Sequence, residues 1–242
     1  MALGVISQGL GGLKEYIYRG LQQLPIVLAS TSLVYTVSTG SLAHLNIFLG
    51  MAFLVPVVTF LLQQFIGWGI GKIWPNSVFW KRGGGDTCNM LPSLKQESLT
   101  YFDKNALVGG SVPSYWLMQV SFFIGYCISN ALDSLLTPPA QGSSAINHEK
   151  RNTHAVLVII TTVIFSLLVL GMRFYFMTAC EGSSNAGLII SCIAALGAAG
   201  IGYGMYDFSK KCGARSSDLF GVLSQILPPS ATSPHPIVCS AS

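Results

Sequence analysis

Few residues in this chain have the types and spacing that chemistry requires. His148 and Glu149 with His154 resemble part of a zinc-binding helix, but the second histidine follows the first by six residues. A zinc helix needs a spacing of four, which places both rings on one face. The three glycines at 83–85 suggest a phosphate-binding loop, yet no Gly-Lys-Ser/Thr follows them and no strand-to-helix context surrounds them. We therefore predict no metal and no cofactor.

Other catalytic patterns are equally incomplete. No Ser, His and Asp set has a recognisable context, and the PSYW stretch at 113–116 lacks the companion His and Arg motifs of a lipid phosphatase. Asp133 and Arg173 lie within apolar runs, each near a run end. Ion-coupled transporters place ionisable groups near the middle of the bilayer. We expect no enzyme and no pump, while a passive channel stays open.

The six cysteines form no CxxC pair and no regular framework. Cys127 and Cys192 lie inside apolar runs, where they are expected to serve as packing residues. The others, Cys88, Cys180, Cys212 and Cys239, could be bridged or free, and the irregular spacing favours free thiols.

Composition determines which elements must position these residues. The 242 residues are 51% hydrophobic and 9% charged, with mean hydropathy +0.57. Soluble domains carry about 25% charged residues, so lipid must cover part of this surface. The apolar residues form continuous runs, which indicates helices, at 24–37, 47–70, 112–136, 155–178 and 186–206. The predicted fold is an all-α polytopic membrane protein with four to five membrane helices and a C-terminal amphipathic helix.

The number of crossings depends on the 112–136 run, which is the most polar of the five and contains Gln119, Asn130 and Asp133. If it crosses, the two sides of the membrane carry similar numbers of Lys and Arg. If it does not, nearly all of them share one side, as the positive-inside rule favours. Its apolar length favours crossing, so both topologies stay open.

Two GxxxG pairs predict close helix packing, because small residues let backbones approach each other. Gly67 lies near the end of the 47–70 run and Gly71 directly follows it, and Gly200 and Gly204 lie in the 186–206 run. We predict that Gly200 and Gly204 lie on a helix–helix contact, and that Gly200→Leu weakens folding or self-association.

The helical membrane domain is predicted at 1–206, with its main polar loop at 71–111, and a tail follows at 207–242. Apolar residues at helical spacing predict an amphipathic helix on the membrane surface, with basic residues facing lipid headgroups; the set is Lys210, Lys211, Arg215, Leu219, Val222, Leu223, Ile226 and Leu227. In the polar loop, Trp80, Tyr101 and Phe102 are candidate contacts to a partner, since aromatic residues dominate interfaces.

Several strings in the second half of the chain resemble membrane proteins of large double-stranded DNA viruses, particularly algal viruses. They are SVPSYWLMQVSFFIGYCISNA at 111–131, ACEG at 179–182, GYGMYDFSKKCGARSSDLFGV at 202–222 and ILPPSA at 226–231. The resemblance implies a multi-spanning virion protein in the internal membrane beneath an icosahedral capsid. It transfers no catalytic residue.

Two functions follow from these expectations. The first is a structural virion membrane protein that tethers the membrane to the capsid layer, and the alternative is a small membrane channel or transporter. Expected partners are the lipid bilayer and capsid-layer or other membrane proteins, and the pattern also allows a homo-oligomer. The net charge of +4 is too small and too dispersed for nucleic-acid binding.

Overall fold

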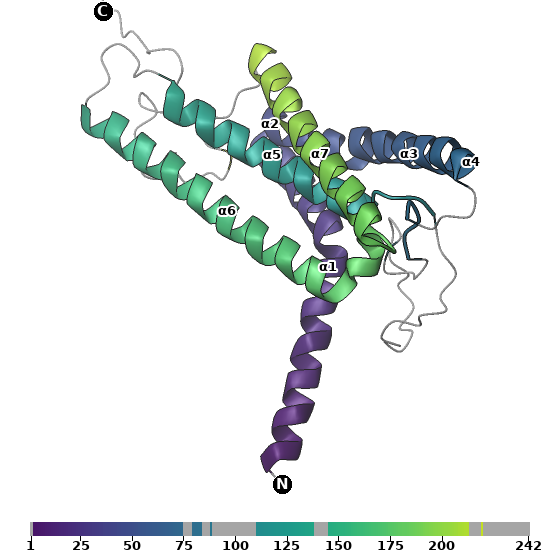
Figure 1. Cartoon of the computed structure of the whole chain (residues 1–242). Helices are drawn as coiled ribbons and strands as arrows, with labels where there is room; N and C mark the ends of the chain where they lie inside the picture. Colours follow the sequence, from purple (N-terminus) through teal and green to yellow (C-terminus); the bar gives the residue numbers. More distant parts are fainter. Residues whose placement is uncertain are drawn as a thin grey trace, which may run out of the picture.

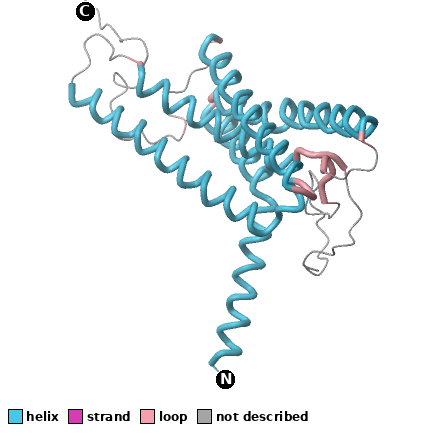
Figure 2. The backbone as a smooth tube through the Cα atoms, viewed as in Figure 1, coloured by secondary structure: helices cyan, strands magenta, loops and turns pink. Residues whose placement is uncertain are grey.

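The structure is a computed structural model, and it describes residues 2–74, 79–83, 88, 110–137, 145–212 and 219, with backbone alone at 2–15, 145–147 and 179. Within these residues every regular element is helical (Figure 2), which confirms the predicted all-α class. The elements are α1 Ala2–Thr39, α2 Leu42–Leu49, η1 Gly50–Leu54, α3 Val55–Phe65, η2 Ile66–Ile70, α4 Gly71–Ile73, α5 Tyr115–Leu136, α6 Ala145–Glu181 and α7 Asn185–Lys211. Helices α2 to α4 form one continuous stretch, in which η1 and η2 are π-helical turns.

Helix α5 lies at the centre and contacts α1, α3, α6 and α7 (Figure 1). Its buried residues include Gln119, Ser129 and Asn130. The Gln119 side-chain amide donates to the carbonyl oxygen of Met51 in η1 at 2.9 Å. A neighbouring helix therefore satisfies Gln119, and packing among helices allows the 112–136 run to carry more polar residues than the other runs.

The helices run alternately between two ends of the bundle. At one end α5 begins and α6 passes into α7 across residues 182–184, and we call this the clasp end. At the other, α5 and α7 both end, and we call this the tail end. Helix α1 joins the two ends, because Trp116 Nε1 donates to the Leu21 carbonyl at 2.5 Å near the clasp end and Tyr35 stacks on His44 near the tail end. The α2–α4 stretch then returns to the clasp end.

Helices α5 and α7 touch backbone to backbone. A Cβ added at Gly125 would lie 2.2 Å from the carbonyl oxygen of Ala199, and one at Gly202 would lie 2.3 Å from that of Phe122. A Cβ at Gly200 or Gly204 meets nothing within 4 Å. The predicted contact of this pair with another helix is therefore wrong within one chain. Residues two positions apart in a helix point in directions about 200° apart. Gly202 faces α5, so Gly200 and Gly204, two residues to either side, face away from it. A contact between copies through Gly200 and Gly204 stays a prediction.

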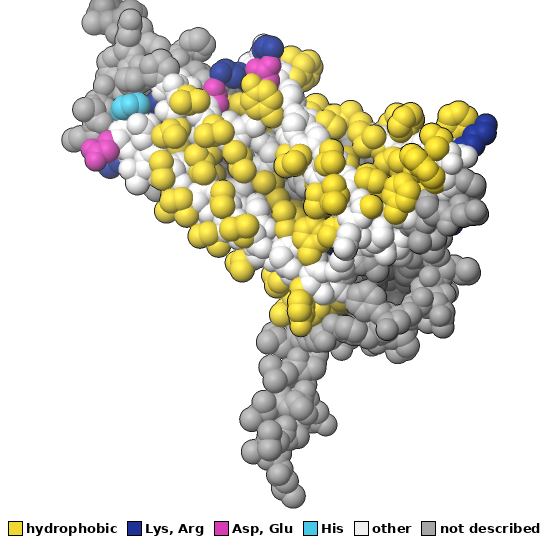
Figure 3. Space-filling view, viewed as in Figure 1, with side chains coloured by type: hydrophobic (Ala, Val, Ile, Leu, Met, Phe, Trp, Pro, Cys, Tyr) yellow, Lys and Arg dark blue, Asp and Glu magenta, His cyan; other side chains and the backbone are white. Residues whose placement is uncertain are grey.

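Three helical stretches are long and apolar enough to cross a bilayer, namely Leu42–Ile73, His148–Thr178 and Asn185–Lys211. They contain the predicted runs 47–70, 155–178 and 186–206, which confirms those runs as apolar helices. Large apolar side chains gather on the outside of the bundle (Figure 3). On α6 they are Leu157, Ile160, Ile164, Leu167 and Leu168, each at least half exposed. Such a surface is compatible with an integral membrane protein.

Three residues that were predicted to lie at the membrane surface make contacts within the chain at the tail end. Lys210 forms an ion pair with Asp133 at 2.6 Å, and Lys211 pairs with Asp207 at 2.6 Å. Leu219 is buried in the apolar cluster around α2, and its carbonyl accepts a hydrogen bond from His44 Nε2 at 2.6 Å. Its placement at a membrane surface is therefore wrong, because the chain folds back onto the helices here. Arg215, Val222, Leu223, Ile226 and Leu227 lie outside the described residues.

Candidate functional site

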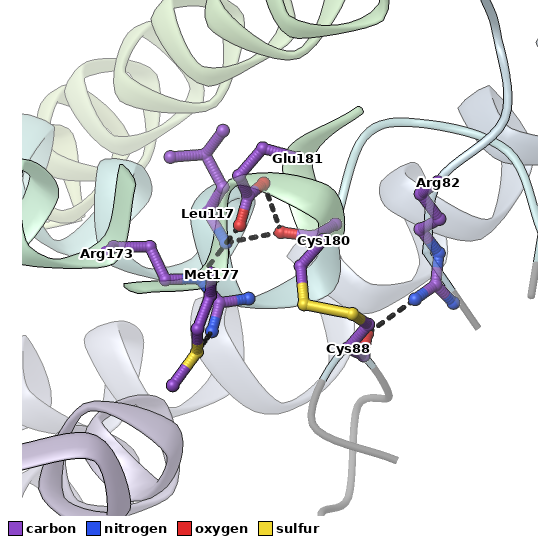
Figure 4. The surroundings of a disulfide bond; sticks show 8 residues. Arg82, Cys88, Leu117, Arg173, Met177, Cys180 and Glu181 are labelled. Carbon is purple, nitrogen blue, oxygen red and sulfur yellow. Dashed lines mark hydrogen bonds and ion pairs between the residues drawn. A yellow bond between two sulfur atoms is a disulfide. The ribbon is translucent and has the colours of Figure 1, made fainter. Parts of the chain in front are cut away.

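A disulfide bond holds the polar loop against the clasp end of the bundle (Figure 4). Cys88 in the loop is bonded to Cys180 near the end of α6 with an S–S distance of 2.04 Å, and both residues are almost fully buried. The expectation of free thiols is wrong for this pair. Irregular spacing was no argument against the bond, because the two residues are 92 positions apart and only the fold brings them together.

Backbone hydrogen bonds reinforce the same attachment. Lys81 and Ser111 form an antiparallel bridge, and Val112 donates its N–H to the Trp80 carbonyl at 3.1 Å. Ser183, in the α6–α7 turn, donates its N–H to the Lys81 carbonyl at 2.9 Å. The two segments by which the loop leaves and re-enters the bundle are thus paired with each other and bonded to the α6–α7 turn. We call residues 79–83, 88, 110–114 and 180–184 the clasp.

Arg82 fixes both ends of the segment 89–109. Its Nη1 donates to the Cys88 carbonyl at 2.6 Å, and its backbone N–H donates to the Gly110 carbonyl at 2.9 Å. Gly110 adopts a φ of +133°, and a Cβ there would come within 3.6 Å of Arg82 Nε. Burial lowers the pKa of Arg82, and the charge of Glu181 acts in the opposite direction. The guanidinium of Arg82 thus holds Cys88, and its backbone N–H holds Gly110.

A buried ion pair lies beneath the clasp. Arg173 Nε and Glu181 Oε1 are 2.9 Å apart, and both side chains are fully buried. In a straight helix eight residues would separate them by about 12 Å along the axis. Met177 departs from helical geometry, with φ −137° and ψ 34°, and this kink brings Glu181 back to Arg173. Arg173 Nη1 also donates to the sulfur of Met177.

The ion pair connects α6 to α5. Ser114, the N-cap of α5, donates its hydroxyl to Glu181 Oε2 at 2.6 Å and accepts the N–H of Leu117 at 3.1 Å. The Arg173 guanidinium lies 4.6 Å from the centre of the Trp116 ring, which is a favourable cation–π distance. Hydrogen bonds and charge therefore hold the start of α5 against the end of α6.

The GxxxG pair Gly67 and Gly71 contacts the polar loop. Ring atoms of Trp80 would lie 3.0 Å from a Cβ at Gly71, and the Ser111 hydroxyl would lie 3.1 Å from a Cβ at Gly67. This GxxxG pair therefore packs against the loop rather than against another helix. Trp80 fastens the loop to α4, while Tyr101 and Phe102 lie outside the described residues.

Sequence reasoning missed the Arg173–Glu181 pair and the role of Arg82. A signal existed for the pair, since charged residues at the end of an apolar run need a partner in or near a membrane.

The first histidine of the rejected zinc pattern contacts an arginine: His148 Nδ1 lies 3.2 Å from Arg151 Nη2. Among the described residues, no group of three His, Cys, Asp or Glu residues could hold a metal ion.

Comparisons with protein-family models, with curated proteins and with solved structures find no match. The functional interpretation therefore rests on the geometry of the clasp, which lies at one end of an apolar helical bundle.

Proposed function

We propose that this chain is an integral membrane protein with a structural role, which ties a membrane to a protein layer through the segment 89–109. The membrane would be the internal membrane of a virion beneath an icosahedral capsid, as the sequence resemblance implies. In this proposal α1, the α2–α4 stretch, α5, α6 and α7 all cross the bilayer. The chain performs no chemistry.

One observation carries the proposal: Arg82 and the Cys88–Cys180 bond fix both ends of the segment 89–109 to the bundle. A segment with fixed ends has fewer conformations, so its ordering on a partner costs less free energy. The kinked end of α6 and the cap of α5 supply the rigid support. A tether needs a segment with fixed ends on a rigid support, because the partner must keep its position relative to the membrane.

Five crossings agree with the directions of the helices. Each of the five segments connects the clasp end to the tail end, and α5 is enclosed by four others. An enclosed helix contacts protein rather than lipid, so it needs less hydrophobicity than α6. The polar loop and Leu219 then lie on opposite sides of the membrane, and the loop and the tail cannot both reach one protein layer.

Tyr101 and Phe102 are the proposed anchors for the partner, since buried aromatic side chains contribute strongly at interfaces. The test uses purified particles whose shell is loosened under mild conditions, with shell proteins quantified on the recovered membranes. The Tyr101→Ala/Phe102→Ala variant should retain less shell protein. Tyr175→Ala is the matched control, because Tyr175 is 80% exposed on α6 and outside the clasp. Equal retention by the natural chain and both variants, or absence of the protein from particles, would contradict the tether.

A channel is less favoured by the packing. Between the two ends, α5 and α7 are in backbone contact at Gly125 and Gly202, which leaves no space between these two helices. Ion or solute flux through proteoliposomes that contain the purified chain would favour the channel over the tether.

A further inference from the structure

We infer that the clasp end faces an oxidising compartment, such as the lumen of the endoplasmic reticulum, and that the tail end faces the reducing cytosol. The inference uses the five-crossing arrangement of the proposed function but not its partner. It identifies the side of the membrane on which anything bound to the segment 89–109 must lie.

The distribution of cysteines is the first argument. The Cys88–Cys180 bond lies at the clasp end, whereas the free and exposed thiol Cys212 follows α7 at the tail end. Disulfides form and persist in oxidising compartments and are rare in the cytosol. When this bond forms, two S–H bonds break, and two electrons and two protons pass to an oxidised dithiol carrier of that compartment by thiol–disulfide exchange.

The packing of the clasp is the second argument. Arg82 Nη1 bonds to the carbonyl of Cys88 itself, and Glu181, next to Cys180, is held by Arg173 and Ser114. Cys88 is thus held by a hydrogen bond to its own carbonyl, and the residue after Cys180 is held by α5 and α6. The bond is thus part of the folded arrangement of the clasp end, and chains folding there must meet an oxidant.

Charge does not decide the orientation. Among the described residues, Lys14, Arg19, Lys72, Lys81, Arg82 and Arg173 lie toward the clasp end, where Glu181 pairs with Arg173, and Lys150, Arg151, Lys210 and Lys211 lie toward the tail end. The positive-inside rule needs a clear excess on one side. The disulfide therefore provides the deciding evidence, and it leads to a direct test.

Two single substitutions create the same glycosylation acceptor at opposite ends. Leu107→Thr turns residues 105–107 into Asn-Ala-Thr, and Ser230→Asn turns residues 230–232 into Asn-Ala-Thr; the natural chain has no such acceptor. Full-length chains are translated with endoplasmic reticulum microsomes, and glycans are detected by an endoglycosidase-sensitive shift on gels.

The expected result is one glycan on the Leu107→Thr chain and none on the Ser230→Asn chain. A glycan on the Ser230→Asn chain alone, on both chains or on neither would overturn the inference. When the same microsomes are dissolved in SDS without reductant, thiol alkylation should label the Cys88→Ser and Cys180→Ser chains at one more site than the natural chain, and the Cys192→Ser chain at one site fewer. Because glycosylation reports only the compartment, a failed orientation and a failed tether give different results.

Discussion

The buried pair Arg173–Glu181 is the most sensitive point of the clasp. Glu181→Leu leaves a guanidinium with no opposite charge where both side chains are 0% exposed, and removing one partner of such a pair costs about 3–5 kcal/mol. The Ser114 hydroxyl loses its acceptor as well, which adds about 1–3 kcal/mol. Arg173→Met should cost a similar amount, because it leaves the carboxylate unpaired.

The double variant Arg173→Met/Glu181→Leu separates pairing from simple loss of contacts. It buries no isolated charge, so it should be more stable than either single variant, although both substitutions are present. The assay is unfolding in mixed detergent micelles by SDS titration, followed by tryptophan fluorescence, with all four chains compared. Additive costs, or single variants that lose less than about 1 kcal/mol, would refute the reasoning.

Three further predictions follow from the packing. Gly125→Ala should lower the thermal unfolding midpoint, because its Cβ would collide with backbone 2.2 Å away. Gly200→Ala meets open space and should leave the midpoint equal or higher. The reverse order would contradict the way α7 faces α5. Gln119→Leu should destabilise by about 1–3 kcal/mol in the same unfolding assay, because it removes the amide that bonds to the Met51 carbonyl, and an unchanged midpoint would count against this bond. Cys88→Ser should cost about 2–4 kcal/mol and speed trypsin cleavage within 89–109, and an unchanged cleavage rate would show that the disulfide does not hold the loop.

Hydrophobic patterning was sufficient to predict apolar helices but not which side of each helix packs against its neighbours. Five continuous runs were predicted as helices, because a membrane-crossing segment must satisfy its own backbone, and three of them lie in stretches long and apolar enough to cross a bilayer. The GxxxG pattern at Gly200 and Gly204 did not reveal which side of α7 meets α5, since Gly202 offers the same small side chain. Only the neighbouring helix determines which glycine is needed.

The clasp could be predicted only in part, because it joins residues that are distant in sequence. Arg173 and Glu181 were visible as charges near apolar runs, but their pairing depends on the kink at Met177. The Cys88–Cys180 bond has no spacing signal, and Arg82 looks like any loop cation until Cys88 and Gly110 are both placed beside it. The folding back of Leu219 against α2 was likewise hidden behind an amphipathic pattern.

Crosslinking in intact particles tests the tether most directly. Lys95 and Lys104 lie in the segment 89–109, and Lys150 and Lys211 mark the tail end. The tether predicts crosslinks from Lys95 or Lys104 to shell proteins, lost when Tyr101 and Phe102 are replaced by Ala and kept in Tyr175→Ala. Crosslinks from Lys95 and Lys104 that reach only other membrane proteins, with shell proteins joined to Lys150 or Lys211 instead, would contradict it.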